Sequence, residues 1–241
     1  MTPPHRAIIA ITSAHADLFE GGGHTTGLFI SEALHPFNVF KKAGFEVDFV
    51  SVTGKYFPDW LSQQPDFLPP ADRAQWEDLS GELRQKLDHQ LYTPDQIDAS
   101  KYGIFFASAG HAALIDYPKA VGIQKIAEQI WNAGGIVSAV CHGPAIFDNL
   151  IDHSTGKPLI QGKQITGFTT EAEYDMKIMD TLKSWGNPLV EETAESMGAK
   201  YSRGAGVWDD YSIVDGRLVT GQNPQSARST AVKVVEAFEK L

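Results

Sequence analysis

Short apolar runs rich in β-branched and aromatic residues alternate along this chain with longer segments of helical spacing. The runs fall at residues 7–12, 45–52, 102–108, 136–140 and 163–168. Such alternation is typical of βαβ units, in which helices join parallel strands and cover the sheet. Because the runs are apolar throughout, they indicate strands that are buried on both faces. The sequence therefore predicts an α/β fold with a mainly parallel sheet.

Helical segments connect these runs, and turn residues mark their ends. Residues 25–44 carry apolar side chains at helical spacing, with one of the two leading threonines as the expected N-cap and the final glycine as the stop. Residues 121–135 repeat this design. Residues 210–221 predict a hairpin on an Asp-Gly turn, and a last helix follows it. The stripe of that helix expected to face the core is Ala227, Ala231, Val234, Val235 and Phe238.

The length and composition fit one folded unit. With 241 residues, of which 42% are hydrophobic, the chain can build a sheet with helices on both faces. We therefore expect a single domain over residues 1–241. Residues 54–100 break the alternation with a stretch rich in Pro, Asp and Gln, which we interpret as an insertion. An insertion of this kind either covers a ligand site or elaborates the surface.

The charge and the cysteine count limit the classes of partner. Nucleic acids and anionic membranes favour clustered Lys and Arg, whereas this chain has a formal charge of −10. The apolar run near the N-terminus is too short for a signal sequence or a membrane span. A single cysteine allows no internal disulfide. We expect a cytoplasmic protein that acts on small molecules or proteins and binds neither nucleic acid nor membranes.

The most informative segment is residues 134–150, where an apolar strand runs directly into Cys141, His142, Gly143 and Pro144. A strand that turns at once into a helix forces the turning residue into a tight backbone, and glycine followed by proline suits such a turn. Cys141 is thereby expected at the carboxyl edge of the sheet, beside a helix N-terminus. That position lowers the pKa of a thiol and predicts a reactive thiolate. The alternative is a small buried hydrophobic residue, the usual fate of a free cysteine.

The histidines give no sign of a metal site. The ring of His142 faces the sulfur only if the turn folds both side chains to one side; otherwise it is structural or solvated. His15, His24, His35 and His111 fall near predicted strand ends, but they lack the tight spacing of metal ligands such as HExxH. We therefore expect no bound metal.

Glu32 is a carboxyl group within an otherwise apolar helical segment. Burial would raise its pKa and let it move a proton, whereas on the polar stripe it would be an ordinary surface glutamate. Two glycine-containing turns, FEGGGHTTG and SAGHAALIDYP, could each present backbone N–H groups to an anion or an oxyanion. Neither matches the GxGxxG or GxxxxGK[ST] patterns of nucleotide-binding loops, so we expect no cofactor.

Several segments together resemble a known family. They read TTGLFISEALHPF, ASAGHAALIDYPKA, AVCHGPAIF, ITGFTTEAEYD and WDDYSIVDGRLVTGQNPQSA. They are similar to the PfpI-like superfamily, which is class I glutamine-amidotransferase-like, and within it to the fungal heat-shock branch of glutathione-independent glyoxalases (glyoxalase III type). The resemblance spans nearly the whole chain. It implies a flavodoxin-like three-layer sandwich without a cofactor, a homodimer in the cytoplasm and also the nucleus, and conversion of the dicarbonyl methylglyoxal and water to D-lactate.

By position, the resemblance implies a Cys-His-Glu triad. Cys141 would be the nucleophile, His142 its neighbour, and Glu173 the acid that orients the histidine. Glu173 is the last residue of the pattern GFTxxxE. The same segment contains an extra carboxylate, Glu171. If the register of the loop slips by two residues, Glu171 could be mistaken for Glu173.

The resemblance also implies how the reaction proceeds. Glu32 matches the acidic residue that faces the cysteine, and the amides of Gly110 and His142 match the pair that binds the oxyanion. Attack of the Cys141 thiolate on the aldehyde gives a hemithioacetal. Glu32 or His142 then moves a proton between the two former carbonyl carbons, and the resulting thioester is hydrolysed. One carbon is oxidised while its neighbour is reduced, so no redox cofactor is needed.

Other functions remain open on the sequence alone. The chain could be a stress-response chaperone or a redox sensor in which Cys141 is oxidised to a sulfinate. It could also be a cysteine peptidase, since a Cys-His-Glu set is protease-like, or a protein deglycase. Chaperone activity should survive Cys141→Ser, whereas glyoxalase turnover should not. Release of amines from peptides would indicate a peptidase.

Overall fold

The computed structural model describes residues 3–19 and 21–241. At its centre is a six-stranded sheet with the strand order β11-β12-β6-β5-β1-β4. In that order the strands span Ser212–Asp215, Leu218–Gly221, Ile136–Val140, Ile104–Ala107, Arg6–Ala10 and Glu46–Val50. All neighbouring strands are parallel except β11 and β12 at one edge. The predicted α/β fold with a mainly parallel sheet is therefore confirmed.

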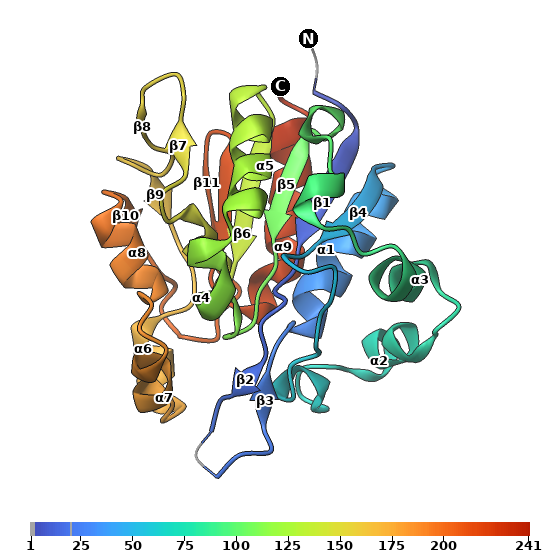
Figure 1. Ribbon diagram of the computed structural model, residues 1–241, viewed down its shortest axis with the longest axis vertical. Helices are drawn as coiled ribbons and strands as arrows, with labels where there is room; N and C mark the ends of the chain where they lie inside the picture. The colour runs from blue at the N-terminus through green and yellow to red at the C-terminus, as the bar shows by residue number, and fades with distance from the viewer. Residues whose placement is uncertain (1–2, 20) are drawn as a thin grey trace.

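Helices cover both faces of this sheet (Figure 1). Helices α1 (Ile30–Lys42) and α9 (Ala227–Phe238) pack against each other behind the sheet, and α5 (Val121–Asn132) lies in front of it. The strands between these layers are apolar because both of their faces are covered, and every residue of β6 is buried. This arrangement is the flavodoxin-like three-layer sandwich that the resemblance implied.

The remaining elements are short and lie around the central sheet. The helices are α2 (Pro70–Glu77), α3 (Glu82–His89), α4 (Ala113–Asp116), α6 (Thr170–Asp175), α7 (Met179–Ser184) and α8 (Val190–Ser196). The strand pairs are β2 (Ala16–Asp17) with β3 (Thr25–Thr26), β7 (Ile151–Asp152) with β8 (Lys157–Pro158), and β9 (Gln164–Ile165) with β10 (Lys200–Tyr201). Helices α2 and α3 belong to the segment that connects β4 to β5.

Helix α1 begins later than the sequence predicted. The two threonines expected as caps form strand β3, and the N-cap position is Phe29, which provides no side-chain hydrogen bond. The preceding residue is held in an extended conformation, because the Leu28 N–H donates to the Phe57 carbonyl and the Asp59 N–H donates to the Leu28 carbonyl. Pairing with the 54–100 segment therefore delays the helix. Its predicted stop is confirmed, since Gly44 follows the helix with φ +83°.

The C-terminal predictions are confirmed, whereas one predicted strand is wrong. The hairpin forms around Gly216, and of the predicted α9 stripe only Val235 is not fully buried. The run at 163–168 does not enter the central sheet; only β9 forms there, and it pairs with β10. Strand β12 of the hairpin lies beside β6.

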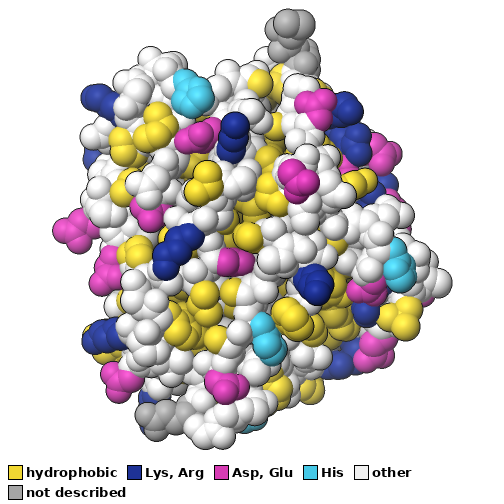
Figure 2. Space-filling view, in the orientation of Figure 1, with side chains coloured by type: hydrophobic (Ala, Val, Ile, Leu, Met, Phe, Trp, Pro, Cys, Tyr) yellow, Lys and Arg dark blue, Asp and Glu magenta, His cyan; other side chains and the backbone are white. Residues whose placement is uncertain are grey.

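Two features of the molecule bear on membranes and nucleic acids as partners. No helix in the described ranges is long and apolar enough to cross a membrane. On the face drawn in Figure 2, Lys and Arg side chains are interspersed with Asp and Glu, and hydrophobic side chains show between them. The described atoms of this face therefore form no extended basic patch of the kind that binds a phosphate backbone.

Candidate active site around Cys141

Cys141 follows strand β6 in a left-handed backbone conformation, with φ 59°. Residues other than glycine seldom adopt this conformation, and it persists where surrounding structure fixes it. Here the Cys141 N–H donates to the carbonyl of Gly221 on β12, and the Cys141 carbonyl accepts the N–H of Phe168. The tight turn predicted from the sequence is therefore present, and it holds the cysteine at the carboxyl edge of the sheet.

The expected lowering of the thiol pKa is wrong. The turn leads into a five-residue 3₁₀-helix, Gly143–Phe147, and a helix this short supplies little dipole. Cys141 is only 2% exposed. Burial, followed by the nearby carboxyl of Glu32, raises the pKa of the Cys141 thiol well above its ordinary value. The resting group is a neutral thiol, and it must lose its proton during the reaction.

Glu32, on α1, lies beside Cys141. Its side chain is completely buried, its Oε2 accepts the N–H of Ala109 over 2.9 Å, and its carboxyl is close enough to Cys141 for each group to shift the pKa of the other. Burial raises the pKa of Glu32 to about 8, although Cys141 and the N–H of Ala109 act in the opposite direction. Glu32 is therefore protonated at neutral pH. Of the two interpretations that the sequence left open, the buried carboxyl is the correct one.

His142 and Glu173 extend this contact into a chain of three side chains. Cys141 Sγ lies 3.2 Å from His142 Nδ1, and His142 Nε2 lies 2.7 Å from Glu173 Oε1. Burial opposes the ionisation of Glu173, but the neighbouring imidazoles outweigh it and lower the pKa of Glu173 to about 2. An ionised carboxylate only accepts hydrogen bonds, so His142 carries its proton on Nε2. The lone pair of Nδ1 consequently faces the thiol.

The neutral form of His142 makes it a base that can accept the thiol proton. Burial, and then the charge of His111, lowers the pKa of His142 to about 4, although Glu173 favours the protonated ring. The imidazole is therefore neutral at neutral pH, with its one proton on Nε2. Proton transfer from Sγ to Nδ1 can accompany bond formation by the sulfur.

The two carboxylates of the GFTxxxE segment are clearly separated. Glu173 is 2% exposed and faces His142, whereas Glu171 forms an exposed ion pair with Arg203. Thr169 fixes this register, because its hydroxyl accepts the N–H of Ala172 and caps helix α6. The structure therefore identifies Glu173, and not Glu171, as the carboxylate that contacts His142.

The two amides expected to bind an oxyanion lie in the turns after β5 and β6. The N–H of His142 is directed at the sulfur of Cys141. Gly110 has φ +137°, and its N–H has no acceptor among the residues that the structure describes. Its neighbour Ala109 donates to Glu32, which brings this turn to the same cluster. The N–H of Gly110 could therefore donate to an oxygen atom of a ligand, and the N–H of His142 could do so once the sulfur has formed a bond to that ligand.

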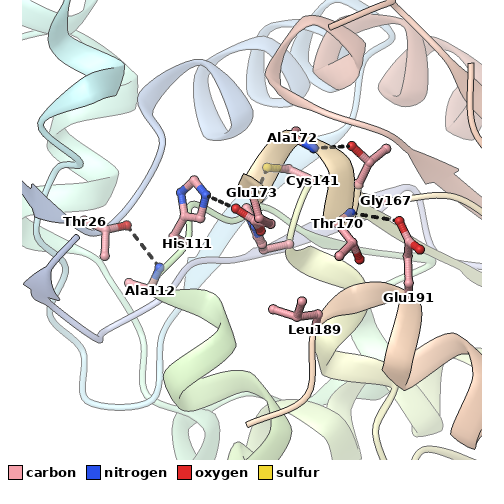
Figure 3. A network of polar contacts seen from close by, with 12 residues as sticks. Thr26, His111, Ala112, Cys141, Gly167, Thr170, Ala172, Glu173, Leu189 and Glu191 are labelled. Atoms are coloured by element: carbon pink, nitrogen blue, oxygen red, sulfur yellow. Dashed lines mark hydrogen bonds and ion pairs between the residues drawn. The ribbon is translucent and has the colours of Figure 1, made fainter. Parts of the chain in front are cut away.

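Two buried residues of the site were missed by the sequence analysis. His111 donates from Nε2 to Glu173 Oε2 over 3.0 Å, and Figure 3 shows its ring pointing at that carboxylate with Cys141 beside the pair. The signal for His111 was its place in the turn after a predicted strand. Asp59 comes from the 54–100 segment and is 1% exposed, and its Oδ2 has no partner among the described residues. No local pattern distinguished Asp59.

The same cluster could hold a metal ion. Ligand atoms of His111, His142 and Glu173 lie within 4.8 Å of one another, and two imidazoles with one carboxylate are a set that Zn²⁺ uses in proteins. In this structure the two imidazole Nε2 atoms donate instead to the two oxygens of Glu173. Two of the ligands come from the turns after β5 and β6 and the third from helix α6, so their spacing in the sequence gave no sign of this set.

The other three histidines noted in the sequence lie outside this cluster. His15 stacks on Phe57, His24 packs against Trp60, and His35 pairs with Asp72 of the 54–100 segment over 2.7 Å. All three partners belong to the 54–100 segment.

Comparisons with known proteins agree with this geometry. Residues 27–237 match the DJ-1/PfpI family. The chain is 50% identical to the glutathione-independent glyoxalase HSP31 of Saccharomyces cerevisiae, over 98% of this chain and 99% of that protein. It is 45% identical to Glyoxalase 3 of Candida albicans, over 97% and 98%. The crystal structure of glyoxalase III from Candida albicans covers 98% of each chain with a TM-score of 0.94 at 45% identity. With its fold, its cysteine turn and these matches, the chain belongs to the DJ-1/PfpI family.

Proposed function

We propose that this chain is a glutathione-independent glyoxalase, which converts a 2-oxoaldehyde such as methylglyoxal and water to a 2-hydroxy acid. The observation that carries the proposal is the position of the Cys141 thiol between two proton carriers. His142 Nδ1 lies 3.2 Å from Sγ, and the buried, protonated carboxyl of Glu32 lies beside Cys141 on α1. The names of the relatives described above support this choice of reaction.

In the first step Cys141 forms a bond to the aldehyde carbon of the substrate. The thiol proton passes to His142 Nδ1 as the S–C bond forms, and Glu173 stabilises the resulting imidazolium. The carbonyl oxygen becomes an oxyanion, which the N–H groups of Gly110 and His142 can stabilise. The product of this step is a hemithioacetal.

In the second step a proton moves between the two adjacent carbons. Glu32 gives its proton to a substrate oxygen and, as a carboxylate, takes the proton from the hemithioacetal carbon to form an enediol; His142 is the alternative base. Return of a proton to the neighbouring carbon gives a thioester of the 2-hydroxy acid. One carbon loses two electrons and its neighbour gains them, so the step is balanced without an external oxidant.

In the third step water cleaves the thioester and restores the Cys141 thiol. Glu32, which the second step leaves as a carboxylate, takes a proton from this water, and the His142 imidazolium returns the thiol proton to the sulfur. Because the protein thiol takes the place that a small thiol would otherwise fill, glutathione is not required. The family resemblance implies that the lactate formed from methylglyoxal is the D form.

The test is an assay of the purified chain with methylglyoxal in the absence of glutathione. We expect lactate to accumulate as the D enantiomer, and we expect none above background from Cys141→Ala, since there is no second cysteine to replace the thiol. Enantiomer-specific lactate dehydrogenases measure the product. A wild-type protein that is folded, reduced and yet makes no lactate would contradict the proposal.

We also propose that the chain acts as a homodimer in the cytoplasm and the nucleus, as the family resemblance implies. Analytical ultracentrifugation is expected to give twice the mass of one chain, and microscopy of a tagged chain is expected to show both compartments. A single-chain mass at micromolar concentration would contradict the dimer.

A further inference from the structure

We propose that His111 is a positioning residue of this active site: it fixes the carboxylate of Glu173, and Glu173 in turn fixes His142 against the thiol. The inference deepens the proposed function. Of its two measurements, only turnover of methylglyoxal depends on that function. The side-chain hydrogen bond of His111 is to Glu173 rather than to Cys141. Its contribution is transmitted through the carboxylate that both imidazoles share.

The geometry gives each oxygen of Glu173 its own imidazole. Oε1 lies 2.7 Å from His142 Nε2, and Oε2 lies 3.0 Å from His111 Nε2. The two rings are 4.1 Å apart between centroids and tilted by 43°. Because an ionised carboxylate only accepts, both rings must donate from Nε2. Two donors at fixed places leave the carboxylate a single orientation.

The second donor matters because the carboxylate would otherwise be free to turn. The terminal torsion of a glutamate is broad, so one hydrogen bond restrains it weakly. Oε2 is buried, since the side chain of Glu173 is only 3% exposed, and without His111 it would lose its hydrogen-bond donor. A carboxylate oxygen in that position favours protonation of the group. Loss of His111 would therefore disturb both the orientation and the charge of Glu173.

His111 is itself held firmly in the turn after β5. The N–H of the next residue, Ala112, donates to the hydroxyl of Thr26 over 3.1 Å (Figure 3). The ring of Phe168 packs edge-on against His111, with 5.3 Å between centroids. Among the described residues, the titratable groups that act on or contact His111 are Glu173, His142 and Asp59. These contacts hold His111 Nε2 in a fixed position relative to Glu173, as a positioning residue requires.

The experiment compares two substitutions of His111 that separate hydrogen bonding from ring volume. His111→Gln places a side-chain N–H close to the position of Nε2, whereas His111→Phe keeps the ring and removes the donor. Cys141 is the chain's one cysteine, so alkylation by iodoacetamide reports on this thiol alone. The alkylation rate is measured from pH 5 to pH 10, beside kcat and KM for methylglyoxal.

The two variants are expected to differ in their rates and to share the wild-type KM. For His111→Phe we expect kcat and the alkylation rate at neutral pH to fall about tenfold or more, because His142 is no longer aligned as a base. The alkylation rate should then rise only at the higher pH at which the thiol ionises unaided. For His111→Gln we expect both rates to stay within about threefold of the wild type, since the donor is kept.

Controls separate a positioning role from a general loss of structure. His153→Phe changes a histidine whose side chain is 63% exposed and is expected to leave both rates unchanged. Thermal unfolding followed by circular dichroism shows whether each variant is folded. If His111→Phe does not fold, His111→Asn replaces it, because its shorter amide cannot reach Glu173.

Each result supports or overturns the inference. Wild-type alkylation and kcat in a folded His111→Phe or His111→Asn variant would overturn it, and so would a folded His111→Gln variant as impaired as the variant that lacks the donor. If the wild type makes no lactate while alkylation follows the expected pattern, the proposed function fails and the positioning role of His111 stands.

Discussion

Glu32→Gln is expected to lower kcat for methylglyoxal by about 10²- to 10⁴-fold, the range that a positioned acid or base contributes. Glutamine has nearly the same shape, and its amide oxygen can still accept the N–H of Ala109. It cannot, however, release or take up the proton that the enediol step moves. Lactate production at saturating substrate measures the effect. Turnover within a few fold of the wild type would remove Glu32 from the mechanism.

The same substitution is expected to make the protein more stable at neutral pH. The pKa of Glu32 is raised from 4.5 to about 8 in the folded chain, so between these values the folded state binds more protons than the unfolded state. The free energy of unfolding therefore falls as the pH rises through this window. At pH 7 the buried carboxyl costs on the order of 3 kcal/mol. Glutamine does not titrate and removes this cost.

Urea unfolding at several pH values measures the stability difference. We expect Glu32→Gln to exceed the wild type at pH 7, and the two free energies to converge near and below pH 4, where the unfolded carboxyl is also protonated. Glu171→Gln is the matched control, because Glu171 is exposed; it is expected to change neither turnover nor this pH dependence. A stability difference that is the same at every pH would contradict a raised pKa of Glu32.

The fold could be predicted largely because its strands are buried on both faces. Continuous apolar runs marked β1, β4, β5 and β6, since a strand covered by two helical layers has no polar face. The run at 163–168, KQITGF, begins with two polar residues and forms only the two-residue strand β9, which pairs with β10. Strand β12 lies beside β6, and which strands pair is a tertiary effect that local composition does not determine.

The site could be predicted where its chemistry is local to one turn. Glycine and proline after Cys141 indicated the tight turn, and the structure has it. The pKa of the thiol could not be predicted in this way, because it depends on burial by other segments and on Glu32, more than a hundred residues earlier in the chain. The role of Glu173 was available only from the resemblance. His111 and Asp59 join the cluster through long-range packing, which spacing cannot reveal.

Gly110→Ala is expected to cause a large loss of stability, because it adds a carbon atom where two backbone segments touch. A Cβ on Gly110 would lie 2.0 Å from the carbonyl oxygen of Gly27, and the backbone has φ +137°. Gly27 cannot move away, since its own α-carbon lies against the backbone of Phe57. We expect the free energy of unfolding to fall by about 3–5 kcal/mol, from the steric clash and the strained φ together. Turnover should also fall, because the N–H of Gly110 would move.

The matched control is Gly134→Ala, which separates steric contact from backbone strain. Gly134 also has a positive φ, +89°, but nothing lies within 4 Å of the Cβ that it would gain. We expect this substitution to cost only about 1–2 kcal/mol, which is the strain of the left-handed conformation alone, and to leave kcat unchanged. Urea unfolding and the lactate assay measure both variants. Strain in φ is common to both positions, whereas close backbone packing belongs to Gly110 alone. Equal losses of stability in the two variants would therefore show that the Gly27–Gly110 contact is not the reason for glycine at position 110.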